Sequence, residues 1–180
     1  MTTNAPPRSR TTTWDDPHIG AQAGAGMAGL EYLRAMIAGR LPAPPFAATV
    51  GFGLVEAEEG RAVFEIEPME VHYNPSGAVH GGVACTLLDS AMGCAVHTTL
   101  PAGVGYTTVE LKVNLVKGIT ARTGLLRAEG RIIHRGNRVA TAEGFLRGAD
   151  GRLYAHATTT CMILPHASGK NPPSEGVRDS

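Results

Sequence analysis

The segment from Gly82 to His97 constrains the fold most, because it is long, apolar and almost uncharged. Between Glu70 and Glu110 the chain carries one formal charge, Asp89. Apolar residues recur at helical spacing and predict a helix packed in the core: Val83, Leu87, Ala91 and Ala95, with Ala84, Leu88 and Met92 beside them. At about 100° per residue, Asp89 falls at the flank of this stripe. A carboxylate in apolar surroundings is costly, so we expect Asp89 to face a cleft and to perform a chemical task.

The segments on either side of this helix predict an antiparallel sheet. Residues 27–39 have helical spacing, whereas six segments are β-branched or alternating: 47–56, 61–66, 106–116, 123–134, 139–147 and 153–164. Tight turns are expected at Glu59-Gly60, Gly136-Asn137 and Ala149-Asp150-Gly151, whose residue types favour positive φ. One long helix followed by a run of strands predicts an α+β fold, with a curved antiparallel sheet wrapped around a central helix.

Composition indicates one compact domain with loose ends. The 180 residues carry 16 basic and 16 acidic side chains, so no bulk charge favours nucleic acid or an anionic membrane as a partner. Residues 1–26 lack periodicity and residues 166–180 are polar, so we predict disordered tails around a domain at 27–165. No stretch reaches the roughly 20 apolar residues of a membrane span, and no signal peptide is evident, so a cytoplasmic location is expected. Three cysteines without CxxC spacing predict neither disulfides nor a metal site.

One motif resembles a known family. The run Asn74-Pro-Ser-Gly77-Ala-Val-His80-Gly81-Gly82, followed after five residues by Leu88-Asp89, resembles the signature of hotdog-fold acyl-CoA thioesterases of the phenylacetate-pathway type. A looser resemblance extends from Phe46 to Met162. It implies the hotdog fold, hydrolysis of an acyl-CoA thioester, no cofactor beyond the coenzyme A of the substrate, and a homo-oligomer, either a dimer or a tetramer of hotdog dimers.

The chemistry can also be argued from the residues. Thioester hydrolysis needs a base or nucleophile for the acyl carbon and a donor for the oxygen that gains charge. Asp89 can supply the first, and a backbone N–H at the helix start, at Gly81, can supply the second. The two residues are eight positions apart, or about 12 Å along one helix, so one chain cannot bring both to a single carbonyl. Two antiparallel copies of the helix can do so.

The resemblance assigns a role to each matching position. Asp89 would be the general base for water or the nucleophile, and Gly81 N–H of the partner subunit would polarise the carbonyl. Asn74 and His80 would position water, carbonyl or loop. Thr108, where some relatives have serine, would hydrogen-bond to the water or to Asp89. Each has a simpler alternative: a solvated aspartate, a histidine that ties down the helix start, a turn asparagine and an ordinary strand threonine.

A second group would hold the coenzyme A part of the substrate. Gly82 would let it approach the backbone closely. Arg135 and Arg138, which flank Gly136-Asn137, would contact its phosphates, although arginines in a hairpin turn are also commonly just solvated.

Two other functions stay open. A non-catalytic acyl-CoA binding module would keep the groove, but it has no need for both an isolated Asp89 and a Gly-Gly helix start. A hotdog dehydratase or hydratase would need a histidine a few residues beyond the acid, and residues 90–96 contain none.

Overall fold

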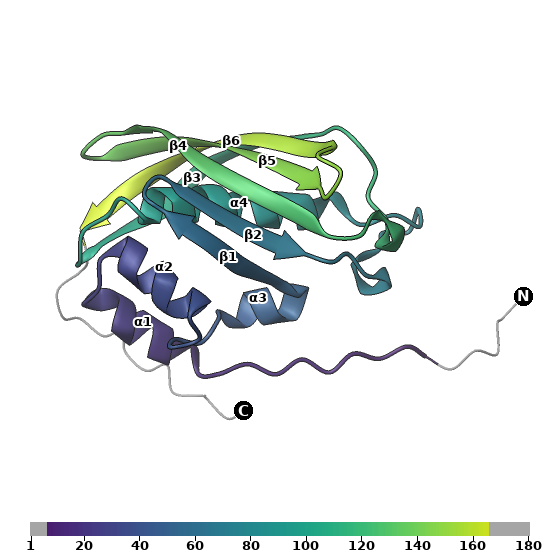
Figure 1. Ribbon diagram of the computed structural model, residues 1–180, viewed down its shortest axis with the longest axis horizontal. Helices are drawn as coiled ribbons and strands as arrows, with labels where there is room; N and C mark the ends of the chain where they lie inside the picture. The colour runs from purple at the N-terminus through teal and green to yellow at the C-terminus, as the bar shows by residue number, and fades with distance from the viewer. Residues whose placement is uncertain (1–6, 166–180) are drawn as a thin grey trace, which may run out of the picture.

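The computed structural model describes residues 7–165, which form a curved sheet around one long helix (Figure 1). The sheet has six strands in the order β1-β2-β4-β5-β6-β3, and every neighbouring pair is antiparallel. The strands are β1 (Phe52–Glu58), β2 (Arg61–Ile66), β3 (Val104–Leu115), β4 (Leu126–Arg135), β5 (Val139–Gly148) and β6 (Leu153–Pro165). This architecture confirms the predicted α+β fold.

The central helix α4 (Gly81–His97) packs against the sheet through the stripe expected from its sequence. Its buried residues include Ala84, Leu87, Leu88, Ala91, Met92, Ala95 and Val96. Gly130 of β4 lies directly over the helix, and a Cβ there would stand 2.4 Å from the Ala91 carbonyl carbon and oxygen. A side chain at Gly130 would therefore push β4 away from α4, and the glycine allows the sheet to curve closely around the helix.

Two predicted strand positions differ from the structure. Residues 47–50 belong to a short helix, α3 (Pro45–Val50), and the strand begins only at Phe52. Pro45 occupies the first helical turn, where its missing N–H costs nothing, and Gly51 ends the helix with φ 87°. Residues 123–125 precede β4, because a 3₁₀ turn, η2 (Ala121–Thr123), occupies the start of that predicted strand. Another 3₁₀ turn, η1 (Glu70–His72), follows β2.

The N-terminal region is more ordered than the predicted tail at 1–26. Residues 17–25 form helix α1 (Pro17–Ala25), which begins with Pro17 and is capped by the Asp16 side chain, a hydrogen-bond acceptor for His18 N–H at 2.9 Å. The small residues of α1 permit close packing, since a Cβ at Gly20 would lie 3.2 Å from the Tyr32 hydroxyl. The small residues of α1, rather than an apolar face, thus allow it to pack against α2 (Gly29–Ile37). The predicted tail at 166–180 and residues 1–6 lie outside the described residues.

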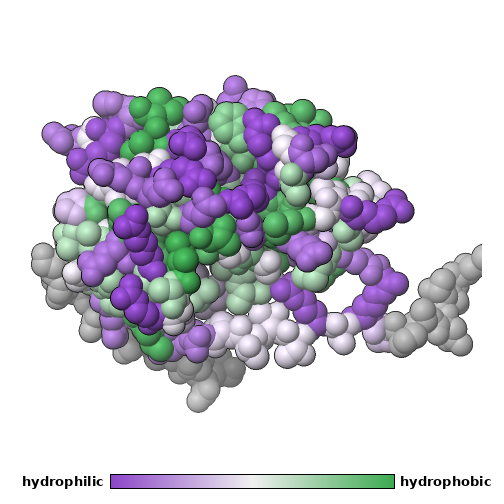
Figure 2. Space-filling model, viewed as in Figure 1, coloured by the Kyte–Doolittle hydropathy of each residue, from purple (hydrophilic) through white to green (hydrophobic). Residues whose placement is uncertain are grey.

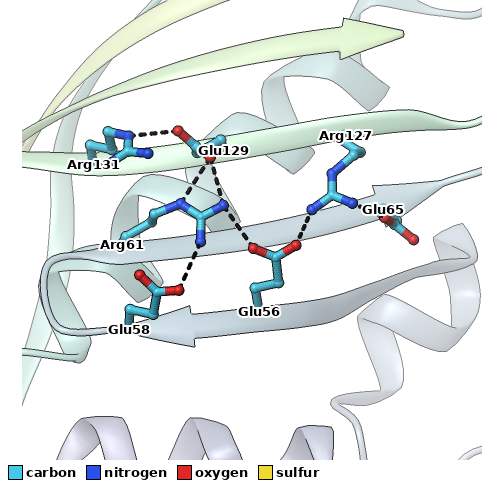
Figure 3. A network of polar contacts seen from close by, with 7 residues as sticks. All are labelled: Glu56, Glu58, Arg61, Glu65, Arg127, Glu129 and Arg131. Carbon is cyan, nitrogen blue, oxygen red and sulfur yellow. Dashed lines mark hydrogen bonds and ion pairs between the residues drawn. The ribbon is translucent and has the colours of Figure 1, made fainter. Parts of the chain in front are cut away.

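The outer face of β1, β2 and β4 carries a network of ion pairs (Figure 3). Arg61 lies at its centre and contacts Glu56 at 2.7 Å, Glu129 at 2.8 Å and Glu58 at 3.5 Å. Further pairs join Arg127 to Glu56 and Glu65, and Arg131 to Glu129. Figure 2 shows hydrophilic side chains over much of this face, with apolar patches between them. The network ties three neighbouring strands together on the side away from α4.

Within residues 7–165, no helix is both long and apolar enough to cross a bilayer. The same residues contain no cluster of three or more His, Cys, Asp or Glu side chains suited to a metal ion.

Candidate active site

Asp89 is one of the residues that line a mainly apolar cavity of about 320 Å³. Its carboxylate is half-buried, and Thr108 Oγ1 of β3 donates a hydrogen bond to Asp89 Oδ1 at 2.9 Å. The lining residues come from α2, the segment around α3, β1, β2, α4 and β3: Met36, Ala43, Pro44, Phe46, Ala47, Phe52, Gly53, Leu54, Phe64, Asp89, Ser90, Cys94, Tyr106 and Thr108. An apolar cavity lined by a few polar groups is typical of a small-molecule site.

Two other ionisable side chains, Cys94 and Tyr106, line this cavity with Asp89, and both are partly buried. Burial raises the pKa of the Cys94 thiol to about 12, which a hydrogen bond from Tyr106 offsets only in part, and Asp89 adds to the rise. Burial likewise raises the pKa of Tyr106 well above its ordinary value of 10.0. Both groups are therefore neutral at pH 7, and Cys94 is a poor nucleophile there. Among the described residues that line the cavity, Asp89 is the one with a carboxyl group.

Gly93 explains how Tyr106 fits beside the helix. A Cβ at position 93 would lie 2.7 Å from the Tyr106 hydroxyl oxygen, so the ring requires a glycine at this point of α4. Tyr106 and Thr108 are two residues apart on β3, and their side chains point to the same face of the strand. β3 thus places both side chains beside α4, one against Gly93 and the other against Asp89.

The start of α4 opens into a different cavity, of about 290 Å³. Its lining residues are Asn74, Ala78, Val79, Gly81, Ala84, Leu115, Val116, Lys117, Gly118 and Ile119. Within residues 7–165, the Gly81 N–H has no hydrogen-bond acceptor. It therefore remains a free donor at the positive end of a 17-residue helix.

His80 and Asn74 both have local structural contacts. The His80 side chain is exposed and caps α4, with Nδ1 accepting the Gly82 N–H at 2.9 Å. Asn74 Oδ1 accepts the N–H groups of Ser76 at 2.9 Å and Ala78 at 3.3 Å, which closes the turn before the helix. These contacts match the simpler alternatives considered from the sequence. Asn74 nevertheless lines the cavity that contains Gly81.

The predicted coenzyme A group is only partly assembled in one chain. Gly82 follows Gly81 at the start of α4, whereas Arg135, Gly136, Asn137 and Arg138 lie in the β4–β5 hairpin. Both arginine side chains are exposed, and neither lines either of the two cavities. Their role as phosphate contacts stays a prediction.

The candidate residues thus fall into two half-sites. Asp89 and Thr108 share one cavity, while Gly81 and Asn74 share the other. Gly81 and Asp89 are both in α4, so the rise of about 1.5 Å per residue separates them by about 12 Å, as expected. One chain does not bring the carboxylate and the free N–H to the same point.

Comparison with known proteins identifies the family. The family model described as "Thioesterase superfamily" matches residues 76–155. A Saccharolobus solfataricus protein named as an esterase is 32% identical over 111 residues, which are 62% of this chain and 77% of that protein. This chain belongs to the thioesterase superfamily.

Two further relatives agree with this assignment. A Ralstonia eutropha protein, whose structure is described as that of a phenylacetic acid degradation-related thioesterase, is 32% identical with a TM-score of 0.66. The match covers 73% of this chain and 98% of that one. A 1,4-dihydroxy-2-naphthoyl-CoA hydrolase from Listeria monocytogenes is 28% identical over 88 residues, 49% of this chain and 70% of that protein. The chain is a thioester hydrolase of the hotdog type, as the sequence motif predicts.

Several residues that line the two cavities of this thioesterase have no role predicted from the sequence. Tyr106 is predicted only as a strand residue. Because it is two residues from Thr108, the two side chains are expected on the same face of the strand, and this spacing is the signal that links them. Ser90 directly follows Asp89 and lines the same cavity, and Lys117 lines the Gly81 cavity from the loop after β3. Phe46 gave no local signal, because only the tertiary position of α3 brings it to the cavity that contains Asp89.

Proposed function

We propose that the protein is an acyl-CoA thioesterase whose active site is completed by two copies of the chain. The observation that carries the proposal is the Asp89 carboxylate, which lines an apolar cavity and accepts a hydrogen bond from Thr108. An apolar cavity suits an acyl chain, and a carboxylate in its wall suits attack on the carbonyl carbon.

In the proposed reaction, water is the second substrate. Asp89 takes a proton from water while the water oxygen bonds to the acyl carbon, or Asp89 itself attacks and water then hydrolyses the anhydride. The carbon–sulfur bond breaks, and the sulfur of coenzyme A leaves with a proton. The products are the free acid and coenzyme A. Thr108 occupies Oδ1 of Asp89, which leaves Oδ2 for the water or for the acyl carbon.

The second half-site would stabilise the charge that develops on the carbonyl oxygen. The free N–H of Gly81, at the positive end of α4, is a preorganised donor of the kind that an oxyanion requires. His80 and Asn74 hold the loop and the helix start around that N–H. Since the two half-sites of one chain are apart, the Gly81 donor would come from the partner subunit.

Strand β3 supports a dimer as the active unit. It lies at the edge of the sheet, spans 12 residues and exposes the apolar side chains of Val109 and Leu115. A long edge strand with exposed apolar residues is a template for pairing with another chain. We propose that two β3 edges pair and place their α4 helices antiparallel. A tetramer of such dimers is compatible with this arrangement.

The test measures the release of coenzyme A from a panel of acyl-CoAs, without added metal, by detecting its free thiol. Asp89→Asn keeps the size of the side chain but loses the base, and we expect kcat to fall by at least about 10²-fold. Arg152→Gln, in an exposed ion pair with Asp150, is a control for a surface substitution. Near-normal turnover by folded Asp89→Asn would contradict the assignment of Asp89. Tight binding of acyl-CoA without turnover by the wild type would instead favour a binding module.

A further inference from the structure

The outer wall of the Asp89 cavity comes from a part of the chain that precedes the family match. Ala43, Pro44, Phe46 and Ala47 line the cavity from the segment that contains α3, and Met36 lines it from α2. The family model begins at residue 76. The carboxylate therefore lies inside the matched region, whereas this wall, like the lining residues of β1 and β2, comes from the part of the chain before it.

Phe46 has an unusual position in this wall. Its side chain is 59% exposed, although it lines an apolar cavity. The ring packs edge-on against Phe52, with centroids 6.3 Å apart, and Phe52 in turn packs against Phe64 of β2. A row of aromatic rings thus runs from solvent toward the core, and Phe46 is its exposed end.

Helix α3 holds Phe46 in this position by several contacts. Ala47 is 5% exposed and anchors the helix in the core. Thr49 Oγ1 donates to the Pro45 carbonyl at 2.9 Å, and Arg10 Nη2 donates to the Ala48 carbonyl at 3.2 Å from outside. Hydrogen bonds hold the backbone of α3, whereas the Phe46 ring is largely exposed to solvent. A ligand in the cavity can therefore contact this ring.

We infer that Phe46 is a specificity-determining residue that limits the length of the acyl chain in the Asp89 cavity. This inference rests on the proposed function. The thioester carbonyl would lie near Asp89 and Thr108, and the acyl chain would extend between the aromatic rings toward α3. A cavity of about 320 Å³ is at the small end of the range for small-molecule sites, roughly 300–1,000 Å³, so the outer wall decides which chains fit.

The charges of the cavity define the chemical class of the acyl group. Among the described lining residues, no Lys or Arg is present, and the only carboxyl group is that of Asp89. A second carboxylate at the far end of an acyl chain would enter an apolar space without a partner. In the part of the site that this chain supplies, the lining therefore favours an acyl group that is apolar and uncharged along its length over one that ends in a carboxylate.

The experiment compares the ratio of kcat/KM for longer over shorter linear acyl-CoAs, from acetyl to palmitoyl. Phe46→Ala removes the outer ring. We expect the ratio of kcat/KM for the next longer acyl-CoA over that for the best wild-type substrate to rise at least about tenfold. Ala43→Phe, at an exposed position of the same wall, should change the ratio in the opposite direction. Trp14→Ala is the matched control, because Trp14 is also an exposed N-terminal aromatic residue but does not line the cavity.

A second comparison tests the charge argument with the wild-type enzyme. Hexanoyl-CoA and adipoyl-CoA have the same chain length and differ by a terminal carboxylate, and we expect adipoyl-CoA to have at least about tenfold lower kcat/KM. Normal hydrolysis with an unchanged length profile in both wall variants would overturn the role of Phe46 and leave the proposed function intact. No hydrolysis of any acyl-CoA by the wild type would overturn both. If Phe46→Ala fails to fold, Phe46→Leu and Ala43→Phe give the same comparison.

Discussion

Thr108 donates a hydrogen bond of 2.9 Å to the carboxylate of Asp89 and so connects the edge strand β3 to the middle of helix α4. The bond fixes one oxygen of a half-buried carboxylate and orients the other. Thr108 therefore links a strand at the edge of the sheet to the candidate catalytic carboxylate.

The Thr108 hydroxyl should therefore matter for turnover rather than for binding. Thr108→Val keeps the shape and removes the donor, and we expect kcat to fall about tenfold or more, since a hydrogen bond to a charged group contributes about 1.5–3 kcal/mol. Thr108→Ser keeps the hydroxyl and should retain most of kcat. Steady-state kinetics on one acyl-CoA would separate kcat from KM. Equal losses in the Val and Ser variants would show that the methyl group, and hence packing, is what counts.

The arginines of the β4–β5 hairpin test where the nucleotide of coenzyme A binds. If Arg135 and Arg138 contact its phosphates, Arg138→Ala should raise KM for an acyl-CoA more than for the corresponding acyl-pantetheine, and added salt should reduce the difference. Lys117→Ala should be measured beside it, because Lys117 lines the Gly81 cavity. Equal effects of Arg138→Ala on KM for both substrates would show that the hairpin does not contact the nucleotide of coenzyme A.

The ion-pair network on the outer face predicts how stability depends on pH. Hydrogen bonds from Arg61 and Arg127 lower the pKa of Glu56 below its ordinary value of 4.5. Burial raises the pKa of Glu129, but hydrogen bonds from Arg131 and Arg61 outweigh it, and the net change is again downward. A carboxyl whose pKa is lower in the folded state stabilises the fold above about pH 4.5, and this contribution is lost as the pH falls further.

Arg61→Met should therefore destabilise the protein at pH 7 and much less at low pH. Partly exposed ion pairs contribute about 0.2–1 kcal/mol each, so losing the three pairs of Arg61 should lower Tm at pH 7 by roughly 1–12 °C. The difference from the wild type should shrink as the pH falls from 4.5 toward 3. Arg152→Met is the control, since its pair with Asp150 is long, at 3.6 Å, and exposed. A Tm difference that is independent of pH would point to lost packing of the Arg61 side chain instead.

The parts of the fold that were predictable from sequence are those with a local pattern. The apolar stripe of α4 and the glycine turns at Gly60 and Gly151, both with positive φ, follow from periodicity and residue type. Helix α3 was predicted as part of a strand, because Thr49 and Val50 favour strands, although Pro45 and Gly51 mark a helix start and end. Helix α1 has no apolar periodicity to predict it, and its glycines Gly20 and Gly24 lie close to the Tyr32 ring.

The site divides in the same way. Asp89 was predictable because an isolated charge in an apolar helix is visible in the sequence, and its placement at the edge of the stripe followed from helical geometry. The cavity around it was not predictable, since Phe46 of α3, Phe64 of β2 and Tyr106 of β3 come together only in the folded chain. Only the folded chain shows that Gly81 and Asp89 open into separate cavities.

That separation leads to the strongest test of a shared site. Asp89→Asn and a Gly81 variant with a bulky side chain should each be inactive alone. A Cβ at position 81 would lie 2.6 Å from Leu115 Cδ1, so Gly81→Val should displace Leu115 and block the helix start. Leu115 is 56% exposed at the end of β3, so the clash should spare the core, and because Leu115 belongs to the edge proposed to pair, light scattering must first show that Gly81→Val still dimerises.

Mixing the two variants should restore activity. In a heterodimer, one site combines an intact Asp89 with an intact Gly81, while the other site carries both defects. Up to about half of the wild-type turnover per dimer is therefore expected once subunits exchange, with exchange verified by differently tagged chains. The matched control mixes each variant with itself and should stay inactive. Verified heterodimers without turnover, or an active monomer by light scattering, would contradict the two-chain site, because a single chain leaves its carboxylate and its free N–H about 12 Å apart.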